Sequence, residues 1–170
     1  KKYYKRKLKF ICKSFDKIDY ETNFDFIFST NDCLNYIPPR NWNSLFLKVK
    51  KSLKDRAYFY FDFTTYSDFY DVWPNHYQII EKNYVVCIKN HFYNKKKRIG
   101  KEVQRYFIKD KNNNFSYHKE EHILYSIKLK KIIDNINNLD FELINFYDPV
   151  SIKKPKNLNN HLRLGCLIRK

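Results

Sequence analysis

Residues 24–36 read FDFIFSTNDCLNY, and this stretch decides the fold of the chain. Its first part, Phe24–Ser29, is a short apolar run of the kind that forms a buried strand. A polar turn, Thr30-Asn31-Asp32, follows directly, and Cys33-Leu34-Asn35-Tyr36 comes next. In open α/β sheets, ligands bind just beyond the carboxyl ends of the strands, so these polar residues are candidates for a binding site.

A helix and another strand come after this stretch. Pro38 and Pro39 precede a segment whose apolar residues recur at helical spacing: Trp42, Leu45, Phe46, Val49 and Leu53. Its last turn is basic, which complements the helix dipole. Residues 57–63 (AYFYFDF) then form a second strand of buried type. Strand, helix and strand in this order predict a parallel βαβ unit with a right-handed crossover.

The middle of the chain has a different pattern. Residues 84–93, 98–109 and 114–125 are long β-prone segments separated by Asn- and Lys-rich turns, which predicts an antiparallel meander. A helix is expected at residues 129–139, with strands at 9–12 (KFIC), 141–147 and 162–169. The predicted fold is α/β with an antiparallel β insertion. Within a single domain, residues 1–75 form a partial α/β core, 76–125 a capping insertion, and 126–170 the remainder of the core.

Composition narrows the class of protein. With 43% hydrophobic residues, the 170-residue chain has enough apolar surface for a core. It contains neither an apolar run long enough to span a membrane nor a signal-peptide core, so a cytoplasmic location is expected. Its Cys residues form no CxxC pair, and neither a disulfide framework nor a metal site is expected.

The net charge of +16 has two interpretations. The lysines are spread along a sequence that is also rich in Asn, Ile, Tyr and Phe, which favours a compositional bias with solvated faces. The alternative is a dedicated surface for phosphate groups, as in nucleic-acid-binding proteins.

The order of these elements and their motifs resembles the small bacterial-type class I S-adenosylmethionine-dependent methyltransferases that carry an antiparallel insertion after their fifth strand. Phe24-Asp25-Phe26-Ile27 matches an FDxI-type strand, and Cys33-Leu34-Asn35-Tyr36 matches an S/A-L-N-Y sequence. Further counterparts follow in the same order: Ser52-Leu53-Lys54, Phe61-Asp62, residues 118–122 (HKEEH), Tyr125-Ser126 and Phe141-Glu142-Leu143.

The resemblance implies the C-terminal part of a Rossmann-like methyltransferase sheet, with S-adenosyl-L-methionine as cofactor. The glycine-rich loop and the acidic strand end of the family have no match, so the chain is expected to be N-terminally truncated and inactive as given. Lys13-Ser14 stands where the family has Gly-Asp, and Asp55-Arg56 replaces a Pro-Gly-Gly turn. The second change is tolerable if the turn needs no positive φ.

Strand ends and the resemblance together assign the site residues. Those expected to contact the cofactor are Ser14, Phe15, Ser29, Thr30, Asn31 and Leu34, and those expected to face the acceptor are Asn35, Tyr36, Asp62, Thr64 and Tyr66. Four of them have structural alternatives, since Ser14 can belong to a loop, Phe15 and Tyr36 can pack in the core, and Asp62 can cap a turn. No catalytic nucleophile or base is assigned, because the cofactor's sulfonium is already a reactive methyl donor.

His118, Glu120 and His122 alternate, so they share one face of a strand. A metal site or a general base is conceivable there, but a solvent-exposed face or a substrate rim is the favoured interpretation.

The favoured function is methyl transfer to a small molecule. The alternatives are a basic RNA-binding module, in which Tyr58, Tyr60, Tyr106 and Phe107 would stack bases, and a degenerate methyltransferase-like partner subunit.

Overall fold

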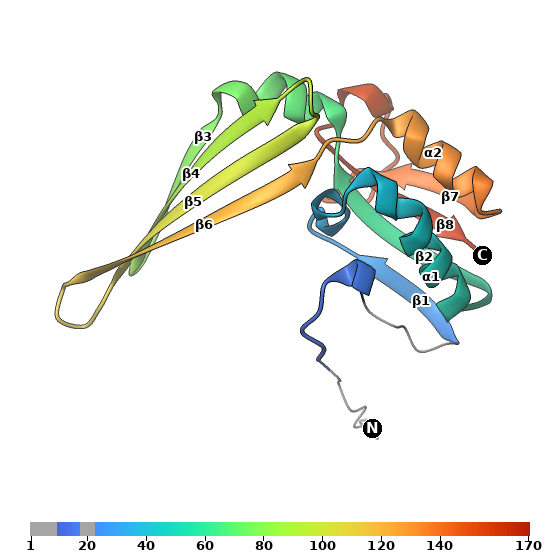
Figure 1. Cartoon of the computed structure of the whole chain (residues 1–170), viewed down its shortest axis with the longest axis horizontal. Coiled ribbons are helices and arrows are strands. Elements are labelled where there is room, and N and C mark those ends of the chain that lie inside the picture. The colour runs from blue at the N-terminus through green and yellow to red at the C-terminus, as the bar shows by residue number, and fades with distance from the viewer. Residues whose placement is uncertain (1–9, 18–22) are drawn as a thin grey trace.

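In this computed structural model, residues 10–17 and 23–170 are described. They form two four-stranded sheets. The first has the order β1-β2-β8-β7 and the second the order β3-β4-β5-β6, and Figure 1 shows the second sheet projecting from the first like an arm. The strands are β1 (Phe24–Ser29), β2 (Leu53–Thr64), β3 (Tyr77–Lys82), β4 (Val85–Asn94), β5 (Ile99–Lys109), β6 (Phe115–Tyr125), β7 (Glu142–Tyr147) and β8 (Arg163–Arg169). The predicted α/β fold with an antiparallel insertion is confirmed.

The first sheet contains the predicted βαβ unit. Strand β1 pairs in parallel with β2, and helix α1 (Trp42–Ser52) connects them. Strand β8 pairs antiparallel with both β2 and β7. The carboxyl ends of β1 and β2 therefore meet at one edge of the sheet, which is where the candidate site residues lie.

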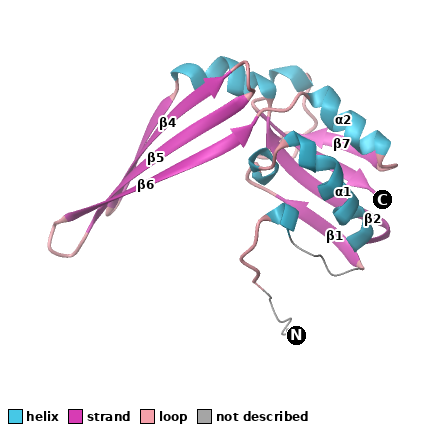
Figure 2. Cartoon of the chain, in the orientation of Figure 1, coloured by secondary structure: helices cyan, strands magenta, loops and turns pink. Residues whose placement is uncertain are grey.

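Both long helices cover the same face of this sheet (Figure 2). Helix α2 (Leu129–Asn138) contributes Ile132 and Ile136 to the same buried cluster as α1. Phe46 of α1 lies at the centre, with its ring edge-on to Phe59 and Phe61 of β2 at centroid distances of 5.7 and 5.3 Å. Alternate residues of β2 point into this core, as the period of a strand requires.

The opposite face is uncovered at the edge strand β1. Phe24, Phe26 and Phe28 are 38%, 50% and 66% exposed, so the prediction of a buried strand is wrong for this face. Only Ile27, which points the other way, packs against the core. The reason is topological: β1 is the outermost strand of its sheet among the described residues.

The strand predicted at residues 9–12 is also wrong where it can be checked. Phe10 to Cys12 form no strand, and Phe10 is 90% exposed; Lys9 lies outside the described residues. An extended segment becomes a strand only by hydrogen bonding to a neighbour, and the described chain provides none for it.

The arm is the predicted antiparallel meander with one strand more than expected. Strands β4, β5 and β6 fall within a residue of their predicted bounds. Strand β3 was missed, and a tight turn at Asn83, with φ of 49°, joins it to β4. Its Tyr77 and Ile79 are 68% and 60% exposed, so β3 carries no buried apolar face that would mark it in the sequence.

A close contact joins the arm to the first sheet. Phe69 and Trp73, in the turns that follow β2, pack on Gly100 of β5. A Cβ at position 100 would lie 2.6 Å from Phe69 and 2.5 Å from Trp73. Only glycine allows this approach, so the residue fixes the arm at its base.

The turn that enters β2 is strained. Strand pairing jumps from Phe24–Leu53 to Phe26–Tyr58, so residues 54–57 bulge out of register. Arg56 in this bulge has φ of 61°, a left-handed conformation that is costly for a residue with a Cβ. The turn thus needs a positive φ. The expectation that Asp55-Arg56 can replace Pro-Gly-Gly without strain, which required the absence of a positive φ, is therefore wrong.

Replacing Arg56 with glycine is therefore expected to stabilise the protein. Relief of the left-handed strain outweighs the added chain entropy of glycine, so the free energy of unfolding rises by about 1 kcal/mol for Arg56→Gly. Urea denaturation measures it. Lys51→Gly, on the exposed side of α1, is the control and lowers stability by about 1 kcal/mol. A loss of stability in both variants would contradict the strain at Arg56.

Candidate active site

Asp62 organises the edge of the sheet where β1 and β2 end. It is on β2 and only 5% exposed. Its Oδ2 accepts a hydrogen bond from the Asn31 amide at 3.1 Å, and its Oδ1 accepts one from the Asp32 amide at 2.6 Å. Both donors belong to the turn after β1, where Asn31 and Asp32 have φ of 60° and 49°. The carboxylate of Asp62 thus holds a left-handed turn that Asn and Asp tolerate better than most residues.

A second carboxylate and an arginine complete this cluster. Nη2 of Arg163, on β8, lies 3.1 Å from Asp32 Oδ1 and 3.0 Å from Asp62 Oδ1. Thr64 Oγ1 donates to Asp32 Oδ2 at 3.3 Å. Burial raises the pKa of Asp32, although Arg163 opposes the shift. Arg163 therefore lets two carboxylates lie close together at the strand ends.

Asn35 ties three elements together. Its side chain is fully buried, and Nδ2 donates to the carbonyls of Thr64 and Tyr125, each at 3.1 Å. Its Oδ1 accepts from the Thr64 amide at 2.8 Å. The ends of β2 and β6 are thereby fixed to the turn after β1. The assignment of Asn35 to acceptor binding stays a prediction, and its amide group is already occupied by these backbone contacts.

Tyr36 reaches the arm. It is 44% exposed, and its Oη lies 3.2 Å from His122 Nδ1, with the two rings edge-on. Burial, followed by nearby acidic groups, raises the pKa of Tyr36 to about 12, so the phenol keeps its proton at neutral pH. His122 Nε2 lies 3.3 Å from Glu120 Oε2, but the pair is too poorly aligned to form a hydrogen bond. Of the alternating residues His118, Glu120 and His122 on β6, it is His122 that contacts Tyr36, while His118 is exposed.

A cavity of about 540 Å³ opens beside the turn after β1. The predicted residues Ser14, Phe15 and Tyr36 all line it, together with Cys33, which was not predicted. Cys33 Sγ donates to the Thr30 carbonyl at 3.0 Å, and burial raises the pKa of its thiol. Residues predicted from strand ends far apart in the sequence thus meet at one cavity.

Other predicted cofactor residues do not line this cavity. Leu34 is fully buried in the main core, and Ser29 is 7% exposed at the end of β1. Asn31 contributes its amide to Asp62, as described, and Thr30 its carbonyl to Cys33. Their contacts with a cofactor remain a prediction.

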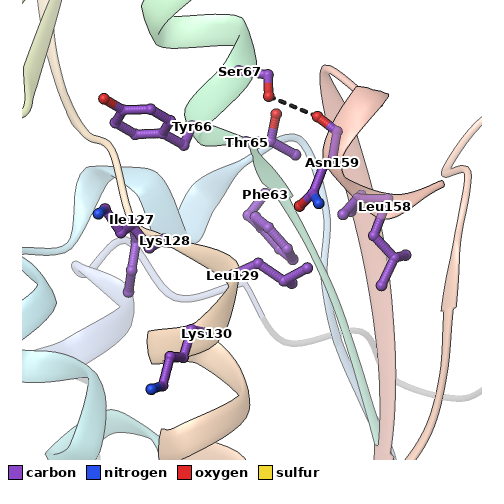
Figure 3. A pocket seen from close by; sticks show the side chains of 11 residues that line it. Phe63, Thr65, Tyr66, Ser67, Ile127, Lys128, Leu129, Lys130, Leu158 and Asn159 are labelled. Carbon is purple, nitrogen blue, oxygen red and sulfur yellow. Dashed lines mark hydrogen bonds between the residues drawn. The ribbon is translucent and has the colours of Figure 1, made fainter.

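A second cavity, of about 320 Å³, lies past the end of β2 (Figure 3). Tyr66, predicted to face the acceptor, lines it with Phe63 and Leu129, while Asp62 and Thr64 do not. Ser67 Oγ donates to the Asn159 carbonyl at 2.7 Å across its rim. The predicted acceptor residues are therefore divided between the two cavities and the polar cluster.

No protein-family model matches the sequence, and no curated protein matches it either. The structure is similar to an S-adenosylmethionine-dependent methyltransferase from Clostridium acetobutylicum, with a TM-score of 0.82 and 20% identity over 94% of this chain and 63% of that one. The chain has the fold of a class I methyltransferase. An amino pentose methyltransferase from Micromonospora echinaspora matches with a TM-score of 0.69 and 8% identity, over 91% of this chain and 61% of its own. A sugar N-methyltransferase from a Streptoalloteichus species matches with a TM-score of 0.68 and 11% identity, over 92% of this chain and 60% of its own.

The chain thus spans about three fifths of the length of these methyltransferases. The resemblance inferred from the ordered motifs is confirmed at the level of the fold. Within that fold, the structure adds Asp32, Arg163 and His122 to the strand-end site. Two of these had a signal in the sequence: Asp32 belongs to the polar turn after β1, and His122 to the alternating set His118, Glu120 and His122. Arg163 had none.

Three further findings concern a metal site, a membrane helix and RNA stacking. Among residues 10–17 and 23–170, no group of His, Cys, Asp and Glu is arranged to hold a metal ion. No helix in the described parts of the chain is long and apolar enough to cross a membrane. The aromatic residues considered for RNA stacking lie in different sheets, Tyr58 and Tyr60 on β2 and Tyr106 and Phe107 on β5, and so form no common platform.

The buried hydrogen bonds of Asn35 make it a test of how the site is held. Asn35→Ala leaves an amide and carbonyl groups without partners, and we expect the free energy of unfolding to fall by about 3 kcal/mol. Asn43→Ala, on the exposed side of α1, is the matched control, with a change below about 0.5 kcal/mol. Chemical denaturation of both variants gives the comparison. Equal stabilities would show that Asn35 does not connect the strand ends.

Proposed function

We propose that the protein transfers a methyl group from S-adenosyl-L-methionine to a small-molecule acceptor. The observation that carries this proposal is the cavity lined by Ser14, Phe15 and Tyr36 at the carboxyl end of β1, within a class I methyltransferase fold. Ligands of open α/β sheets bind at such strand ends. The structural neighbours include an amino pentose and a sugar N-methyltransferase, which supports a small acceptor.

The residues of this cavity suit the cofactor. Phe15 is half-buried and offers an aromatic ring on which an adenine can stack, and its neighbour Ser14 is a polar group at the same wall. A cavity of about 540 Å³ is large enough for a ligand of this size. When bound, the cofactor supplies a sulfonium methyl group that is already reactive, so the protein mainly has to position the acceptor and remove its proton.

We further propose that Tyr36 and His122 take up that proton. Because its pKa is raised to about 12, Tyr36 cannot act as the base itself, but its hydroxyl can accept the acceptor's proton while passing its own to His122 Nδ1, 3.2 Å away. Glu120 Oε2, 3.3 Å from His122 Nε2, then stabilises the imidazolium that results. The pair is at the junction of the arm and the first sheet, so the arm contributes one of its two residues.

Cofactor binding can be tested without knowing the acceptor. We expect the complete protein to bind S-adenosylhomocysteine in a calorimetric titration, and Phe15→Leu to weaken that binding about tenfold because a ring stacked on a base is lost. The leucine keeps most of the packing volume of Phe15. Phe10→Leu, at a 90% exposed ring nearby, is the control and leaves the affinity unchanged. An intact, folded protein that fails to bind would refute the proposed function.

The proton carrier has its own test. Tyr36→Phe and His122→Asn should each slow the formation of S-adenosylhomocysteine by about a hundredfold, with a panel of small amines, amino sugars and hydroxyl compounds as acceptors. Affinity for S-adenosylhomocysteine should stay within about twofold, since the interaction removed acts on the acceptor.

His118→Asn is the matched control, since His118 is an exposed histidine on the same strand. It should leave the rate unchanged. If it reduces the rate as much as His122→Asn does, the Tyr36–His122 pair has no specific role.

A further inference from the structure

A third cavity, of about 290 Å³, lies between the first turn of α2 and the turn that joins β4 to β5. Its walls are strongly basic: Lys97, Arg98, Lys128, Lys130 and Lys131 line it, and Asp134 is the single acidic residue among the lining side chains. Within the described chain, none of these cations forms an ion pair with a carboxylate. All five side chains are exposed, so water screens part of their mutual repulsion, and an anion in the cavity would lower it further.

The position of the lysines makes this arrangement more costly. The amino end of a helix carries a partial positive charge and favours acidic residues, yet the first turn of α2 has none. Lys128 is the N-cap residue, no side chain caps the free amides, and Lys130 and Lys131 follow in the first turn. Helix α1 shows the usual arrangement, with Lys50 and Lys51 in its last turn. Of the two α-helices in the described chain, α2 is thus the one with lysines at its unfavourable end.

A buried hydroxyl at the same cavity has no partner. Ser126 lines the cavity and is 3% exposed, and its Oγ makes no hydrogen bond. The Tyr93 hydroxyl is near enough for Ser126 to influence the pKa of Tyr93, which burial raises, but the two lack hydrogen-bond geometry. A buried polar group without a partner costs free energy, which a ligand oxygen at this position would recover.

We infer that this cavity binds a phosphoryl group carried by the methyl acceptor, an inference that rests on the proposed function. A phosphoryl group offers several acceptor oxygens and a double negative charge, which match the amides of the first turn of α2, the Ser126 hydroxyl and the guanidinium of Arg98. The cavity adjoins the candidate active site, because Tyr125 lines it and the Tyr125 carbonyl accepts from Asn35. An acceptor anchored there by its phosphoryl group could extend its reactive atom toward Tyr36.

The test is a calorimetric titration of the complete protein at low ionic strength with inorganic phosphate and with glucose 1-phosphate, a simple phosphate ester. We expect saturable binding of both, with the ester at least about tenfold tighter because its organic part occupies the neighbouring site. The double variant Arg98→Gln with Lys131→Gln should weaken binding by at least about tenfold, since charge-assisted hydrogen bonds are lost. The control pair, Lys111→Gln with Lys156→Gln, changes the net charge equally at exposed positions that do not line this cavity, and should have no effect.

Several results would overturn the inference. One is the absence of saturable phosphate binding, and another is equal weakening in the control pair, which would indicate a diffuse effect of charge. Equal affinities for phosphate and ester would assign the cavity to free phosphate, and displacement of the ester by a short single-stranded RNA at lower concentration would assign it to a nucleic-acid backbone. Titration with S-adenosylhomocysteine in parallel separates the two proposals: if it binds while phosphate does not, only the anion site is wrong.

Discussion

The structure depends on the buried amide of Asn35. It satisfies its donors and acceptor with backbone groups of Thr64 and Tyr125, and so joins the turn after β1 to the end of β2 and to the last strand of the arm. A polar side chain this deeply buried is tolerable only when its hydrogen bonds are made. The same bonds therefore set both the stability of the junction and the distance between Tyr36, one residue later, and His122 on the arm.

Charge is balanced around this junction at short range. Asp62 is nearly buried and serves as an anchor for backbone amides, which leaves little of its carboxylate for a ligand. Asp32 is the more accessible acid, and burial raises its pKa even though Arg163 holds it. Because Arg163 contacts both carboxylates, loss of the arginine would leave two like charges close together in a half-buried place. These contacts make the cluster a support for the turn after β1, and in the proposed function Tyr36 and His122 are the groups that face the acceptor.

The sequence predicted the parts of the fold that local pattern controls, and it failed where the outcome depends on a neighbour. The periodicity from Trp42 to Leu53 and the motif at residues 24–36 located the βαβ unit and the strand-end residues. Residues 9–12 have the pattern of a strand, but Phe10 to Cys12 pair with no strand among the described residues. Strand β3 was missed because its side chains are exposed on both faces. Arg163 reaches Asp32 across 131 residues of sequence, a distance at which no local pattern reports a contact.

The basic composition can now be divided into two kinds of lysine. Most are scattered over exposed faces, as a compositional bias produces, and they need no ligand to explain them. A compositional bias does not depend on the direction of the helix dipole, so it would place lysines equally often at either end of α2. The lysines at the first turn of α2 face a positive dipole, an uncapped helix end and further cations at Lys97 and Arg98. The unfavourable position of these lysines lies at the same cavity as the unpartnered hydroxyl of Ser126. An anionic ligand with acceptor oxygens would stabilise both the lysines and the hydroxyl.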